Sequence, residues 1–161
     1  MDPIAFQTQA HTIHAALSTL PGADAPRLDA ARKALDEELL ALEADLRQVA
    51  PTAHALASNH PAFGHLARRL ELSITDFDLD PGAPPPAETA SAVERWAHAS
   101  EAPLLLWEAT PSEATLRSMP AGVQHLTLDP LEHPSEGATY DYIQQARRNV
   151  AALGALQTAQ D

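Results

Sequence analysis

The fold is decided by residues 58–69, Ser58-Asn59-His60-Pro61-Ala62-Phe63-Gly64-His65-Leu66-Ala67-Arg68-Arg69. The apolar run 53–57 precedes this stretch, and apolar residues recur at helical spacing after Pro61. The pattern predicts a short buried strand, a turn and an amphipathic helix over 61–70. His60 then lies at the carboxyl end of a strand, where α/β folds bind ligands, and at a helix N-terminus, which keeps imidazole neutral for metal binding. The alternative is that His60 only caps the helix.

Short apolar runs alternate with helical patterns in the rest of the second half. Strands are predicted at 53–57, 72–76, 104–107 and 123–128, and further helices at 86–99, 112–119 and 138–157. This alternation, with short connections, predicts a four-stranded parallel sheet covered by helices on both faces. The fold class is therefore α/β, as a three-layer α/β/α lobe.

Two helices are predicted before this lobe. The first spans 4–19 and ends at Pro21-Gly22; the second spans 24–50, with leucines at spacings of three, four and seven. We expect the long helix to pack across the sheet, with Glu43 among its solvent-facing charges, rather than to form a coiled coil. The sequence thus predicts one domain, 1–161, made of an N-terminal helix (1–23), a long linker-type helix (24–50) and the lobe (51–161).

Composition narrows the possible functions. The chain has one lysine, Lys33, and nine arginines but 22 acidic residues, which gives a net charge of −12. Neither nucleic acid nor an anionic membrane surface is therefore an expected partner. No apolar run approaches a membrane span, and no signal peptide is visible in this sequence, which leaves a cytoplasmic location open. Without cysteine there is no thiolate site. No nucleophile elbow or phosphate loop occurs, so we expect no enzyme.

Acidic side chains follow several predicted strands, as His60 does. Glu108 follows the third strand and Asp129 the fourth, while Asp76, Asp78 and Asp80 follow the second. These ends share one edge of a parallel sheet, and one histidine with one or two carboxylates suits Zn²⁺ or Mn²⁺. Solvated loop carboxylates and helix caps are the alternative.

Other histidines and carboxylates give weaker patterns. His11 and His14 lie three apart on a helix, a spacing that can present both rings to one metal, but with no third ligand nearby the pattern favours exposed helix histidines. The ring of His65 diverges from that of His60. The remaining candidates lie in a proline-bounded loop near Asp129: Glu132, His133 and Glu136. The two tryptophans, Trp96 and Trp107, are predicted to be core or semi-buried packing residues.

Residues 58–69 resemble the second-lobe motif of the zinc and manganese solute-binding proteins of ABC transporters (cluster A-I). Further motifs follow in the family's order. They are Pro84-Pro85-Pro86-Ala87-Glu88, Leu105-Leu106-Trp107-Glu108, Leu128-Asp129-Pro130-Leu131, and a final helix region with Tyr140 and Asn149. The resemblance covers most of the chain after Asp24 and implies the C-terminal lobe of such a protein. It also implies a periplasmic or extracytoplasmic location.

The resemblance implies that His60 and Asp129 are metal ligands, with Zn²⁺ favoured over Mn²⁺. The family takes two further histidines from a first lobe that is absent from this sequence; Met1-Asp2-Pro3 resembles the tail of a motif whose histidine would lie upstream. The site is therefore expected to be incomplete. A second copy or another polypeptide could complete it, or a local third ligand such as Glu108, Glu132 or His133.

The alternative function is an interaction or dimerisation domain with a vestigial site and no bound metal. We expect a homo-oligomer or a partner that supplies the first lobe, because an isolated lobe exposes apolar surface along the long helix and the metal edge. A transporter permease is a further expected partner by resemblance.

Overall fold

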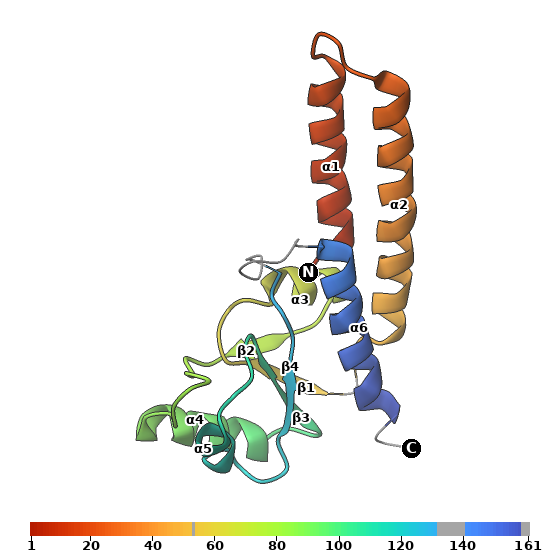
Figure 1. Cartoon of the computed structure of the whole chain (residues 1–161). Helices are drawn as coiled ribbons and strands as arrows, with labels where there is room; N and C mark the ends of the chain where they lie inside the picture. The colour runs from red at the N-terminus through yellow and green to blue at the C-terminus, as the bar shows by residue number, and fades with distance from the viewer. Residues whose placement is uncertain (53, 132–140, 159–161) are drawn as a thin grey trace.

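Four parallel strands form the central sheet, in the order β2-β1-β3-β4. The computed structural model describes residues 1–52, 54–131 and 141–158 (Figure 1). Helices cover both faces of the sheet, which confirms the predicted three-layer α/β class. The elements are α1 (Pro3–Ser18), α2 (Ala25–Gln48), β1 (Ala55–Ser58), α3 (Gly64–Leu70), β2 (Ile74–Asp76), α4 (Ala87–His98), β3 (Pro103–Trp107), α5 (Glu113–Arg117), β4 (Gln124–Thr127) and α6 (Tyr142–Thr158).

Within the described ranges, each predicted helix and strand is present, with shifted boundaries. The predicted helix 61–70 begins three residues later than expected, since α3 starts only at Gly64 with Phe63 as its N-cap residue. The amide of Ala62 donates to the carbonyl oxygen of His60 at 2.7 Å, so a turn separates His60 from the helix. The hypothesis that His60 caps this helix is therefore wrong. Ala53 and residues 138–140 lie outside the described residues.

A hydrophobic core lies on each face of the sheet. Successive residues of β3 point to opposite faces of the sheet. Leu104 and Leu106 pack in one core, and Leu105 and Trp107 pack in the other. The first core joins Met1 to α2, α3 and α6, and Leu153 of α6 is fully buried in it. The second core includes Val93 of α4. Trp107 is fully buried, and Trp96 is half-buried and packs edge-on against Phe77, so the two are core and semi-buried packing residues, as predicted.

Helix α2 has two different halves. Leu39, Leu42 and Leu46 near its C-terminus are fully buried, and Leu42 and Leu46 pack into the core beside the sheet. The N-terminal half instead pairs with α1 as an antiparallel hairpin whose outer end projects beyond the lobe (Figure 1). The expected packing across the sheet is therefore confirmed for the second half alone. Among the described helices, none has the length and hydropathy that a bilayer crossing requires.

The predicted exposure of Glu43 on α2 is wrong. It was expected to face solvent, but it is 7% exposed. Its Oε1 accepts hydrogen bonds from Arg47 Nε at 2.6 Å, from Arg69 Nε at 2.8 Å and from the Arg69 terminal nitrogen. The helical period of α2 places Glu43 beside the leucine face, and α3 then covers it. This ion pair joins α2 to α3.

His125 on β4 is a half-buried titratable group, and we predict that it makes stability depend on pH. Its Nδ1 accepts a hydrogen bond from Trp107 Nε1 at 3.1 Å, and burial lowers the pKa of His125. As the pH falls through the ordinary histidine range, the unfolded chain binds a proton that the folded chain resists. The free energy of unfolding should therefore fall from pH 7 to pH 5.

The variant His125→Asn retains an acceptor near the Nδ1 position but cannot titrate. Urea unfolding of both proteins from pH 7 to pH 5 measures the difference. We expect the variant to lose less stability over this range than the unmodified chain. Parallel curves would contradict the assignment to His125. The other histidines are unchanged in this comparison, so their contributions cancel.

Candidate metal centre

His60 and Glu108 lie side by side at the carboxyl edge of the sheet. They follow β1 and β3, the two central strands, at the point where the chain connections turn to opposite sides of the sheet. In open α/β sheets this switch point is where ligands bind. His60 Nδ1 lies 3.7 Å from Glu108 Oε2, and the side chains are 58% and 32% exposed. The pair therefore presents one nitrogen and one carboxylate to solvent.

Asn59 fixes the backbone on both sides of this pair. Its side chain is fully buried; Oδ1 accepts from the Glu108 amide at 2.9 Å, and Nδ2 donates to the Leu79 carbonyl oxygen at 3.2 Å. One amide group thereby joins the loops that follow β1, β2 and β3. This role of Asn59 was not predicted. The sequence signal for it is an asparagine between an apolar strand and a candidate ligand, where the end of the strand is expected to be buried.

Asp129 lies at the same edge, beyond β4. Its backbone amide donates to Asn149 Oδ1 at 3.0 Å, and its carbonyl oxygen accepts from Asn149 Nδ2 at 2.7 Å. Asp129 Oδ1 accepts from the amide of Leu131 at 2.8 Å, and Leu131 has a left-handed backbone with φ of 65°. This conformation is costly for a leucine, and such strain is concentrated at functional loops.

The strand order sets the spacing of the three candidate ligands. β3 lies between β1 and β4, so Glu108 lies between His60 and Asp129 along the edge. Parallel strands are about 4.8 Å apart, so the loops of His60 and Asp129 are separated by about 10 Å. The side chains of His60 and Asp129 must therefore reach toward each other across Glu108 to share one ion.

The other sequence candidates do not join this group. Asp76 accepts a hydrogen bond from Ser58, Asp80 accepts from the Gly82 amide, and His65 pairs with Arg68. His11 lies 2.7 Å from Asp36 and His14 lies 2.9 Å from Asp29, so both rings pair with carboxylates of α2. Glu132, His133 and Glu136 lie outside the described residues. Across residues 1–52, 54–131 and 141–158, no three histidine or acidic side chains are grouped closely enough to hold a metal.

The first turn of α1 adjoins the loops that carry His60 and Asp129. Phe6 stacks on Tyr142 of α6, with ring centroids 4.3 Å apart and planes 8° from parallel. A hollow runs between these elements, and its lining includes Ala62 and Pro130, which lie within two residues of His60 and Asp129 along the chain. It is lined by Met1, Asp2, Ala5, Phe6, Gln9, Ala62, His65, Pro130, Leu131 and Tyr142. The candidate edge is therefore bordered by α1 as well as by the sheet loops.

Solved structures share this architecture. The zinc-bound ZnuA-like domain of Streptococcus pneumoniae AdcA is 22% identical; the match has a TM-score of 0.82 and covers 96% of this chain and 61% of that one. The metal-dependent lipoprotein YcdH of Bacillus subtilis is 21% identical, with a TM-score of 0.84 and the same coverages. FpvC of Pseudomonas aeruginosa, solved with Mn²⁺, is 22% identical, with a TM-score of 0.72, over 98% of this chain and 60% of that one.

This chain thus spans about three fifths of the length of these structures. A comparison with curated proteins gave no match. The family model described as zinc-uptake complex component A, periplasmic (ZnuA), matches residues 1–155. The chain therefore belongs to the ZnuA family.

Proposed function

We propose that this chain is a divalent-metal-binding domain of a metal-uptake solute-binding protein, with His60 and Asp129 as ligands. The observation that supports this most directly is the approach of His60 to Glu108, 3.7 Å apart, at the switch point of the sheet, with Asp129 on the same edge. Imidazole nitrogen favours Zn²⁺ over Mn²⁺. Family membership supports a role in transport, not catalysis.

The site needs more ligands than these two. A closed zinc site uses about four protein ligands, and a site that keeps an open position uses about three. Glu108 is our candidate for the third, since its carboxylate lies between the loops of His60 and Asp129; His133 is the other local candidate. A first lobe or a second polypeptide would supply the rest, next to the first turn of α1. We further propose an extracytoplasmic location and a transporter permease as partner, on family membership alone.

An interaction domain with a vestigial site is the second candidate function. Two observations favour it: the described residues hold no three-ligand group, and the outer end of the α1–α2 hairpin carries exposed apolar side chains. In this case the loops that carry His60 and Asp129 would retain their conformation at the carboxyl edge of the sheet but would bind no metal ion.

Calorimetric titration with Zn²⁺ separates these two functions. We expect weak binding to the unmodified chain, and a loss of affinity of about tenfold or more, ~1.4 kcal/mol, in His60→Ala and in Asp129→Ala. Glu108→Gln should weaken binding if its carboxylate is a ligand. Equal heats in the unmodified chain and in the His60 and Asp129 variants would overturn the metal site.

His98→Ala is the matched control. His98 Nε2 lies 3.8 Å from Glu94 Oε1 on α4, with both side chains largely exposed, so this pair resembles that of His60 and Glu108 in chemistry but lies on a helix surface. We expect its removal to leave the Zn²⁺ titration unchanged. Loss of the heat in this variant would show that zinc binds surface histidines without selectivity.

A further inference from the structure

Asn149 of α6 bonds both main-chain polar groups of Asp129. The amide of Leu128 still donates to β3, to the carbonyl oxygen of Trp107 at 2.9 Å, but the next residue is held by a side chain instead of a strand. The carboxamide of Asn149 accepts from the Asp129 amide at 3.0 Å and donates to the Asp129 carbonyl oxygen at 2.7 Å. Asn149 is 5% exposed. Because buried polar groups are costly to leave unpaired, α6 fixes where the main chain of Asp129 lies.

The carboxylate of Asp129 is also held, through one of its two oxygens. Oδ1 accepts from the amide of Leu131 at 2.8 Å, across Pro130, which has no amide hydrogen of its own. This bond closes a turn of the kind that aspartate forms with the main chain two residues ahead. Within the described residues Oδ2 makes no hydrogen bond, and Asp129 is half-buried. Asp129 therefore offers one carboxylate oxygen to a bound ion.

The turn after Asp129 is strained and depends on the structure around it. The φ of Leu131 is 65°, in the left-handed region that a leucine rarely adopts. Strained conformations of this kind persist only where neighbouring groups hold them. Asn149 holds the residue that begins the turn, so its loss should let Leu131 relax and leave the carboxylate of Asp129 free to rotate.

The number of oxygens that a carboxylate offers affects which ion it binds. Zn²⁺ is bound mostly by four ligands, whereas Mn²⁺ favours six oxygen ligands in an octahedral arrangement. To give both of its oxygens to one ion, Asp129 would have to lose its bond to Leu131. A restrained Asp129 that offers one oxygen therefore favours the ion with the smaller ligand number, Zn²⁺.

We propose that Asn149 is a positioning residue that determines ion specificity, because it holds Asp129 as a one-oxygen ligand and so favours Zn²⁺ over Mn²⁺. Both polar atoms of the Asn149 side chain already bond to Asp129, so Asn149 acts through that residue and not as a ligand. The inference rests on the proposed function, in which Asp129 is a ligand. It adds a source of ion preference that lies in α6, outside the ligand set.

Titration of the full chain with Zn²⁺ and with Mn²⁺ tests this role in Asn149→Leu, which removes both hydrogen bonds at nearly constant volume. We expect the Zn²⁺ dissociation constant to rise about tenfold, the lower end for residues that orient a ligand, and that of Mn²⁺ to rise less. The preference for Zn²⁺ should therefore shrink. Asn149→Ser, whose hydroxyl can keep one of the two bonds, should shift the preference in the same direction by less.

Leu153→Ala is the matched control for a merely structural role. Leu153 is fully buried one turn further along α6 and has no bond to Asp129, so the variant weakens the packing of α6 without releasing the turn. We expect the ratio of the two dissociation constants to stay as in the unmodified chain. An equal shift of this ratio in Leu153→Ala and in Asn149→Leu would overturn the proposal.

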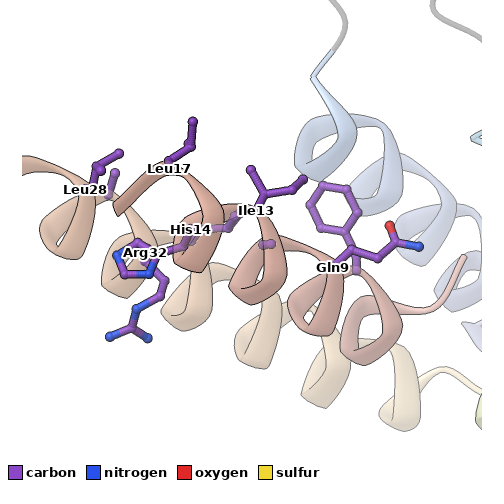
Figure 2. A pocket seen from close by; sticks show the side chains of 10 residues that line it. Gln9, Ile13, His14, Leu17, Leu28 and Arg32 are labelled. Atoms are coloured by element: carbon purple, nitrogen blue, oxygen red, sulfur yellow. The ribbon is translucent and has the colours of Figure 1, made fainter. Parts of the chain in front are cut away.

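His14→Ala is the control for metal bound elsewhere. His14 of α1 and Arg32 of α2 line a hollow in the hairpin (Figure 2), and His14 Nε2 lies 2.9 Å from Asp29 Oδ1. This is another histidine–carboxylate pair, but it lies on the hairpin that projects from the lobe (Figure 1). Both dissociation constants should be unchanged. A loss of Zn²⁺ affinity as large as in Asn149→Leu would place the measured zinc on the hairpin and contradict the role of Asn149.

Hydrogen exchange of the metal-free chain, followed by NMR, is a second measurement. The Leu131 amide should exchange about tenfold faster in Asn149→Leu, because its carboxylate acceptor is released, and at its usual rate in Leu153→Ala. Unchanged exchange in Asn149→Leu would overturn the positioning role. So would zinc binding whose preference over Mn²⁺ is the same with and without Asn149. An unmodified chain that binds neither ion would overturn the proposed function, and the specificity inference with it.

Discussion

Asn59→Ala is expected to lower the free energy of unfolding by about 2–4 kcal/mol. The side chain is fully buried, and its loss leaves the Glu108 amide and the Leu79 carbonyl oxygen without their partner inside the protein. Each unsatisfied buried polar group costs about 1–3 kcal/mol, and the vacated volume adds to the loss. Urea unfolding followed by circular dichroism measures the change.

A site-specific effect should accompany this loss of stability. With Asn59 removed, the loop after β3 is no longer tied to the loop after β1, so His60 and Glu108 lose their fixed spacing. Zn²⁺ affinity should therefore fall at temperatures where the variant is still folded. Gln124→Ala, at an exposed position of β4, serves as the control and should change stability by less than about 0.5 kcal/mol. If Asn59→Ala also changes the free energy of unfolding by less than about 0.5 kcal/mol, the Asn59 side chain does not stabilise these loops.

Arg69→Ala is expected to cost about 2–3 kcal/mol of stability, because it leaves the buried carboxylate of Glu43 with Arg47 alone. Breaking a fully buried ion pair costs about 3–5 kcal/mol. We lower this value because the Arg69 side chain is 27% exposed and Arg47 still donates at 2.6 Å. The hydrogen bonds to Glu43 also raise the pKa of Arg69, which agrees with a favourable pairing. Chemical unfolding at neutral pH is the measurement.

Two further variants test whether the loss of stability comes from leaving the buried Glu43 carboxylate poorly paired. Arg117 and Glu113 on α5 form an ion pair with both side chains largely exposed, so Arg117→Ala should change stability by less than about 0.5 kcal/mol. The double variant Glu43→Leu with Arg69→Leu replaces both charges by apolar groups and should recover most of the loss. If the double variant is as unstable as Arg69→Ala, an unpaired buried carboxylate is not the cause.

Much of the fold could be predicted from the sequence because periodicity reports burial. The apolar runs at β1 and β3 and the leucine spacing of α2 each identify an element that packs on the sheet. Periodicity does not report which element covers which. Glu43 is predicted to face solvent because it is charged, although its helical position lies beside the leucines, and it is buried because α3 brings Arg69 over it, a contact between residues 26 positions apart.

The candidate site was predictable in its residues but not in its arrangement. Parallel strands ending in His60, Glu108 and Asp129 imply one shared edge, yet local sequence does not encode the strand order β2-β1-β3-β4. That order makes His60 and Glu108 neighbours and places Asp129 one strand further away. Asn59 and Asn149 were missed as supports for the loops because their hydrogen bonds join distant segments.

The core that joins Met1 to Leu153 has a consequence for how the protein is made. A ribosome releases the chain from its N-terminal side, but this core takes side chains from Met1 and α2 and also from α6, more than 90 residues later. Leu42, Leu46 and Leu56 therefore have no complete packing partner until α6 has been synthesised and has left the exit tunnel. During this interval the nascent chain exposes the apolar face of α2, so chaperone occupancy should be highest just before α6 emerges.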